Sequence, residues 1–150
     1  MSIIFDMEFI MPFREKSAWI MSFALVLGTF FYFGAVLSIW REIGQIASPA
    51  VPLVVIFTVI LIAIAIIGHI IIATFAPKDA NAPMDERERE IFSRAGNLSS
   101  YVLGFGVITS LGHYLLLGSG DLLFYTVFAS LIVAQIAEYL LQILFYRTSF

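Results

Sequence analysis

The chain consists of long apolar runs separated by short polar segments. Four runs are long enough to cross a membrane, at about residues 17–40, 51–75, 98–117 and 122–146. A helix needs about 20 residues to cross a bilayer core, and lipid offers no hydrogen-bond partner to a free backbone group. The pattern therefore predicts an all-α integral membrane protein of one domain, residues 1–150, with four transmembrane helices in an antiparallel bundle.

The segment at residues 78–97 is the polar exception and separates two apolar hairpins. It holds nine of the nineteen charged residues. Asp85 and Glu88 have the D-x-x-E spacing of a helix-capping box. We therefore expect a short, exposed cytoplasmic helix at about residues 83–95, between the second and third spans. This helix either continues into the third span or is broken at Gly96-Asn97.

The positions of lysine and arginine predict the orientation of the four helices. Trp19 and Trp40 lie about 30 Å apart on a helix, which places one tryptophan at each membrane interface. Seven of the eight basic residues lie at one end of the predicted bundle, and only Arg41 lies at the other. Basic residues accumulate on the cytoplasmic side. We expect a multi-pass protein of the cell (inner) membrane with both termini in the cytoplasm, and residues 1–13 lying along the membrane surface.

Small residues recur along the third span and predict close helix packing. Ser100–Gly104 and Gly106–Ser110 have the small-x-x-x-small spacing that lets helix backbones approach closely in lipid. The turn at residues 118–121, G-S-G-D, is short, so the third and fourth spans form a hairpin. A bundle of this size buries little surface, which favours a homo-oligomer or a membrane or cytoplasmic protein partner in addition to the lipid.

Composition narrows the classes of function. The chain is 61% hydrophobic and 13% charged, with a net charge of −3 and a mean hydropathy of +0.98. It has no basic stripe that could neutralise phosphates, which makes nucleic-acid binding improbable. It has no cysteine, which excludes disulfides, thiolate metal sites and thiol catalysis. No serine-nucleophile, zinc-protease or phosphate-loop motif occurs, so we expect a protein that is not an enzyme.

Glu138 is the most conspicuous polar residue within a span. A carboxylate at the centre of a membrane helix costs on the order of 3 kcal/mol, so such a residue faces protein or water. Gln135, Glu138 and Gln142 recur at i, i+3 and i+7 and form a stripe on one helical face. Two interpretations compete. Glu138 binds a proton, a cation or an amine, or it is hydrogen-bonded to neighbours and holds helices together. The structural interpretation is favoured.

The two histidines lie at different depths. His69 is roughly 9 Å and Glu138 roughly 13 Å from the cytoplasmic ends of their helices, so the two can pair if those helices touch. His113 lies roughly 13–15 Å above His69, which is too far for both to bind one haem iron. No cofactor is predicted. A lipid- or quinone-binding site among the many phenylalanines is a weaker alternative.

The charge run in the polar segment is a candidate docking surface. It comprises Asp85, Glu86, Arg87, Glu88, Arg89 and Glu90. The arginines neutralise the acids pairwise, which argues against a metal cluster. Acid-before-base pairs at i,i+4, Asp85–Arg89 and Glu90–Arg94, support a helix here. A solvated helix face is the simpler interpretation, and a partner surface is the functional one.

The D-E-R-E-x-x-I segment, Asp85 to Ile91, ahead of the third span resembles small uncharacterised prokaryotic four-helix membrane proteins. The resemblance covers about residue 84 to the end of the fourth span, and it implies fold and membrane location but no activity. The leading functional hypothesis is a non-enzymatic structural, regulatory or accessory module that acts through helix packing and the charged segment. The alternative is a proton-coupled transporter or small-ligand-binding bundle that uses Glu138 with His69.

Overall fold

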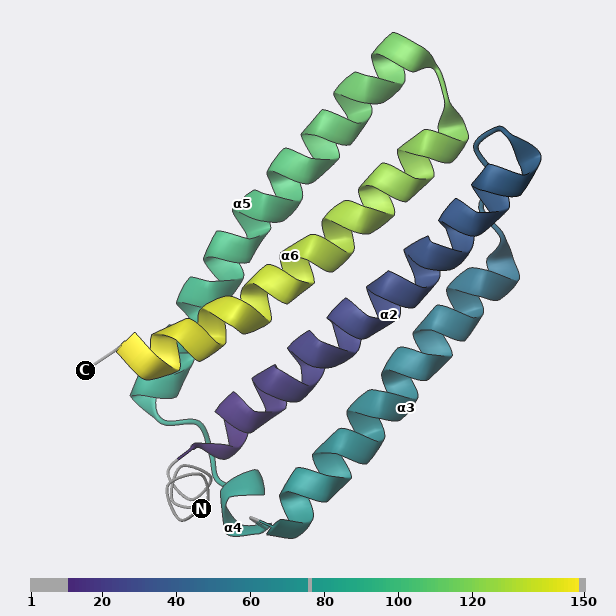
Figure 1. The fold of residues 1–150 in the computed structure, drawn as a ribbon. Helices are drawn as coiled ribbons and strands as arrows, with labels where there is room; N and C mark the ends of the chain where they lie inside the picture. The colour runs from purple at the N-terminus through teal and green to yellow at the C-terminus, as the bar shows by residue number, and fades with distance from the viewer. Residues whose placement is uncertain (1–10, 76, 149–150) are drawn as a thin grey trace.

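The computed structural model describes residues 11–75 and 77–148, and the segment before residue 11 that we expected on the membrane surface lies outside them. The described chain is helical almost throughout (Figure 1). Its elements are α2 (Phe13–Ile43), α3 (Val51–Phe75), α4 (Pro77–Ala80), α5 (Glu86–Leu117) and α6 (Gly120–Thr148). All but α4 are long and apolar enough to span a membrane, which agrees with the four predicted spans.

Proline, glycine and an aspartate mark the ends of the helices. α2 begins directly after Pro12, which has no N–H to leave unsatisfied, and ends at Gly44. Gly44 has a φ of 75° and donates its N–H to the Trp40 carbonyl, a left-handed cap that favours glycine. Asp85 caps α5 by accepting a 2.7 Å bond from the Glu88 N–H. The predicted N-terminal cap is thus present, although the Glu88 side chain bonds elsewhere.

The polar segment does not form a helix of its own. Residues 86–97 are the first three turns of α5, which runs without a break through Gly96-Asn97 into the predicted third span. A short helix does lie between the second and third spans, but it is α4, at Pro77–Ala80. Glycine within a helix costs only about 1 kcal/mol, which the long apolar helix that follows outweighs.

The four long helices lie side by side in the order α5, α6, α2, α3 (Figure 1). α5 packs on α6, α6 on α2, and α2 on α3. α2 and α6 are therefore central, and α3 and α5 form the two edges of the layer. The start of α2, the end of α6, α4 and the start of α5 lie at one end, called here the terminal end. The links 44–50 and 118–119 lie at the other, the loop end.

The core is small and aromatic, and it joins three helices. The rings of Tyr32 in α2, Phe57 in α3 and Phe128 in α6 contact one another with centroids 5.1 to 5.6 Å apart. Leu25 and Ile132 extend this cluster along α2 and α6. Phe57 is the one buried residue of α3 among those described. The rest of that helix presents valine and isoleucine outward, which suits contact with lipid.

Only half of the predicted small-residue face lies in a helix contact. Gly106 and Ser110 face α6, and a Cβ at Gly106 would lie 2.5 Å from the Ser130 Oγ and 2.6 Å from its Cβ. Ser100 is exposed, and a Cβ at Gly104 would meet nothing within 4 Å. The two pairs are separated by enough helical rotation that one faces inward and the other outward.

We expect Gly106→Ala to destabilise the protein by about 1–3 kcal/mol, because the added methyl group forces α5 and α6 apart. Gly104→Ala is the matched control and should be neutral or stabilising by up to about 1 kcal/mol, since it removes glycine from an open helix surface. Reversible unfolding in detergent micelles measures both. Equal effects of the two substitutions would contradict the close α5–α6 contact.

A second pair of variants compares the contributions of two buried tyrosine hydroxyls to stability. The Tyr32 hydroxyl is buried without a hydrogen-bond partner in the described part of the chain, whereas the Tyr125 hydroxyl donates to the Ala47 carbonyl at 3.0 Å. Tyr32→Phe should therefore leave the free energy of unfolding unchanged or raise it, and Tyr125→Phe should lower it by about 1 kcal/mol. The same unfolding assay tests this, and the reverse ranking would show that the hydroxyls are bonded differently.

Candidate functional site

Charged side chains tie three helices together at the terminal end. Arg147 of α6 donates to Glu15 of α2 at 2.9 Å and lies over the Trp19 ring. Arg14 of α2 donates to Glu88 of α5 at 3.0 Å. The Glu15 side chain is only 6% exposed. A buried carboxylate is strongly destabilising without its partner, so Arg147 is needed wherever Glu15 is ionised.

Sequence reasoning missed Glu15, which is buried in the structure. Its neighbours in sequence, Arg14 and Lys16, make it look like part of a solvated end. Its position on the helix indicates instead that Glu15 faces the protein interior, because Ala18, Ser22 and Leu25 follow it at helical spacing and are all buried. The burial of Glu15 could have been predicted from the sequence, because the carboxylate lies on the same helical face as the small residues Ala18 and Ser22.

Glu138 lies in a hydrogen-bonded cluster between α5 and α6. It accepts from the amides of Gln135 and Gln142 at 3.3 Å each, and from the Ser99 hydroxyl at 3.5 Å. Ser99 and Gln142 are buried. The two glutamines lie on α6 with Glu138, and Ser99, which also donates to the Gly96 carbonyl at 3.0 Å, makes the contact from α5. The predicted polar stripe therefore lies in a helix interface, and its carboxylate acts as the common acceptor.

His69 joins a different pair of helices. Its Nδ1 lies 2.6 Å from the Ala65 carbonyl and its Nε2 lies 2.7 Å from the Ser17 hydroxyl of α2. A carbonyl can only accept, so Nδ1 carries the hydrogen, and in the neutral ring Nε2 accepts from Ser17. The structure thus does not pair His69 with Glu138. Similar depth was insufficient, because α3 packs mainly on α2 and reaches α6 through the Phe57–Phe128 ring contact rather than at His69.

A cavity of about 400 Å³ lies between these two groups, and it is called here the terminal cavity. Residues from all four long helices line it. Its polar lining consists of Arg14, Ser17, His69, Tyr139 and Gln142. Met21, Ala65 and Phe92 are among its apolar lining residues. The cavity thus brings together two of the four predicted intramembrane polar residues, and Glu138 bonds to one of them, Gln142.

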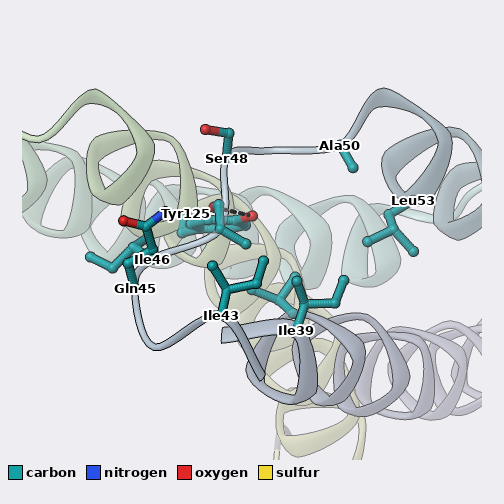
Figure 2. Close-up of a pocket in the computed structure, with 10 residues that line it drawn as sticks. Ile39, Ile43, Gln45, Ile46, Ser48, Ala50, Leu53 and Tyr125 are labelled. Carbon is teal, nitrogen blue, oxygen red and sulfur yellow. Dashed lines mark hydrogen bonds between the residues drawn. The ribbon is translucent and has the colours of Figure 1, made fainter. Parts of the chain in front are cut away.

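A second cavity, of about 260 Å³, lies at the loop end beneath the link between α2 and α3 (Figure 2). Its lining is mainly aliphatic and includes Ile39, Ile43 and Leu53. Its hydroxyl groups already have partners, since Tyr125 donates to the Ala47 carbonyl and Ser48 donates to Asp121, both at 3.0 Å. These bonds hold the link against the start of α6 and leave no hydroxyl donor free.

The six candidate docking residues divide into two groups. Asp85 caps α5, Glu88 bonds to Arg14 and to the Tyr146 hydroxyl, and Arg87 donates to the Tyr146 carbonyl at 3.3 Å. These three are used within the chain. Glu86, Arg89 and Glu90 are exposed.

Of the two predicted i,i+4 pairs, Glu90–Arg94 is present at 3.8 Å between exposed side chains. An Asp85–Arg89 ion pair is absent from the described residues. No group of three or more histidine, aspartate or glutamate residues within residues 11–75 and 77–148 could hold a metal ion.

No family model matches the chain, and no curated protein or solved structure shows significant similarity to it. The resemblance of residues 85–91 to small prokaryotic membrane proteins therefore stays a prediction. Inferences about function therefore rest on the contacts within the chain.

The Glu138 cluster predicts a graded response to substitution. Glu138→Leu should destabilise the protein by about 1–3 kcal/mol, because it leaves the buried Gln142 amide without its acceptor, whereas the Ser99 hydroxyl keeps the Gly96 carbonyl at 3.0 Å. Glu138→Gln should cost less, since its amide oxygen can still accept one bond. Glu86→Leu, at an exposed position, is the control and should change stability by less than about 0.5 kcal/mol. Unfolding in micelles measures all three, and a neutral Glu138→Leu would overturn the structural role of the cluster.

Proposed function

We propose that this protein is a non-enzymatic accessory module of the cell membrane, which presents one face of α5 to a protein partner. Its four long helices cross the bilayer as an antiparallel bundle. The terminal end, where seven of the eight basic residues lie, is on the cytoplasmic side. Arg41 is the single basic residue at the loop end.

The state of the conspicuous polar groups supports this proposal over a proton-coupled transporter. Glu138 is the common acceptor of an interhelical cluster, and His69 is bonded at both ring nitrogens. Glu15 is paired with Arg147. A proton-carrying carboxylate needs a partner that changes during transport, whereas each of these groups has a packing role that occupies it.

One continuous exposed face of α5 carries the proposal. Glu86, Glu90, Ser93, Asn97, Ser100 and Gly104 recur at spacings of three and four, so they lie in one line along the helix. The first five are exposed, and space is open above Gly104. The line begins with charges and continues into small residues. A partner helix can approach closely at the small residues while its polar end meets the charges.

α5 is also an edge of the layer, so the face is not covered by another helix of the chain. The partner is another membrane protein with a cytoplasmic extension, or a second copy of this chain. Both occupants fit the outward Ser100–Gly104 pair, because Ser100 is exposed and a Cβ at Gly104 would meet nothing within 4 Å among the described residues.

A photo-cross-linking amino acid at Ser93 should give a discrete product in native membranes. Exchanging the charges at two exposed positions, with Glu86→Lys and Arg89→Glu together, should abolish that product while the net charge stays the same. Arg87 is unsuitable for this test because it bonds within the chain. The product is measured by immunoblot and its mass by mass spectrometry.

The control places the same cross-linker at Leu115, which is 84% exposed at the loop end of α5. Products at that position should not respond to the charge exchange. A product at Ser93 with twice the mass of the chain identifies a second copy, and any other mass identifies a different protein. Absence of a product at Ser93, or a product indifferent to the charge exchange, contradicts the proposed surface.

A further inference from the structure

The terminal cavity has the dimensions and the lining of a small-molecule site. Its volume of about 400 Å³ lies within the range of roughly 300–1,000 Å³ that is typical of ligand pockets. Such pockets are mainly apolar and carry a few polar groups that orient the ligand. Here Phe13, Met21 and Phe92 supply apolar surface, and the polar groups come from α2, α3 and α6.

Two polar groups of the cavity have unused hydrogen-bonding capacity. The Tyr139 hydroxyl has no partner in the described part of the chain. Gln142 is only 2% exposed and uses one amide N–H to reach Glu138, and its oxygen and second N–H have no partner among residues 11–75 and 77–148. The Tyr32 hydroxyl is the one fully buried side-chain polar atom without a partner in the described part of the chain, so the open groups of Tyr139 and Gln142 are accessible to a ligand in the cavity.

The other polar groups of the cavity are occupied. Ser17 and His69 bond to each other, and the remaining ring nitrogen of His69 bonds to a carbonyl. Arg14 donates to Glu88 and to the Ala82 carbonyl, both at 3.0 Å. The open donors and acceptors therefore lie on α6, and a ligand would be oriented by that helix.

The charges around the cavity select a neutral ligand. No aspartate or glutamate is among the residues that line it, so it offers nothing to a cation. Arg14 is the one lining residue with a permanent positive charge, and Glu88 already compensates that charge at 3.0 Å. An anion would gain little from a neutralised guanidinium and would lose its hydration. An apolar molecule with a neutral hydrogen-bond acceptor needs no counter-charge and loses little hydration on binding.

We infer that the terminal cavity binds a neutral, largely apolar molecule that carries a carbonyl group, such as a quinone. The Tyr139 hydroxyl donates to the carbonyl oxygen, and the Gln142 amide supplies a second bond as donor or acceptor. The apolar residues surround the ring. Such molecules reach the site from the lipid, where they concentrate.

Menadione, a bicyclic naphthoquinone, is the test probe. It reacts with thiols, but the chain has no cysteine, so binding is free of that side reaction. The full chain in phosphatidylcholine nanodiscs should bind menadione saturably, with one molecule per chain, above the partition into empty nanodiscs. Isothermal titration calorimetry measures this. Binding that does not saturate, or that equals the empty-disc value, overturns the inference.

Two probes test the chemistry. 2-Methylnaphthalene has the ring without the carbonyl groups and should bind at least tenfold more weakly. 2-Naphthoate carries an anionic carboxylate and should also bind more weakly than menadione. Equal binding of 2-methylnaphthalene would show that the cavity recognises only apolar bulk. Tighter binding of 2-naphthoate would show an anion site. Either result overturns the assigned ligand class.

Two variants test the location. Tyr139→Phe removes a hydroxyl that has no partner among the described residues, so it should leave the unfolding temperature unchanged and weaken menadione binding about five- to tenfold. Tyr32→Phe removes a second unpartnered hydroxyl, outside this cavity, and should leave menadione affinity unchanged. Ala65→Leu should fill the cavity and lower affinity as well. Unchanged affinity in both Tyr139→Phe and Ala65→Leu places the ligand elsewhere and overturns the site.

Discussion

The contact between α2 and α6 is the interaction on which the rest of the structure depends. α2 with α3 and α5 with α6 are two hairpins, and they meet mainly along this seam, with further contacts at Arg14–Glu88 and Phe57–Phe128. An ion pair, an aromatic contact and a hydrogen bond stabilise this contact along its length. The Glu15–Arg147 ion pair lies at the terminal end, the Tyr32–Phe128 ring contact lies in the middle, and the Tyr125 bond to Ala47 lies at the loop end. Both cavities described here are lined by residues of α2 and of α6, so their shape depends on this contact.

In lipid, apolar side chains do not drive helices together, because the surrounding acyl chains are equally apolar. Packing, hydrogen bonds and ion pairs must supply the energy of the seam. This explains why the few polar residues of so apolar a chain lie between helices, at Ser99 and Glu138 and at Ser17 and His69. It also explains why α3 needs only one buried residue, Phe57, to hold its place.

The existence of the helices could be predicted from the sequence, and their full lengths could not. The second run, 51–75, coincides with α3, but the first run, 17–40, lies inside the longer helix Phe13–Ile43. An apolar run marks the part of a helix that suits lipid. The ends of the helix are set by backbone caps such as Gly44 and Asp85. The helix expected at about residues 83–95 and the third span from residue 98 are one helix, α5, which begins at Glu86, so of the two alternatives left open the continuous one is present.

The candidate site could be predicted only where one helix carries the pattern. The spacing of Gln135, Glu138 and Gln142 identified their common face, and the structure places that face against α5. Hydrogen bonds and ion pairs between different helices could not be predicted in this way, because the pattern within one helix does not show which helix lies next to it. Whether His69 meets Ser17 or Glu138 depends on which helices are neighbours, and the depth of a residue does not reveal that. Glu15 and Arg147 lie 132 residues apart, and nothing local to either identifies the other.

That separation has a consequence for how the protein is made. Glu15 is synthesised 132 residues before Arg147, so the segment that forms α2 and α3 is complete before its counter-ion exists. The ion pair between α2 and α6 can therefore form only at the very end of synthesis, once the last turn of α6 has been made.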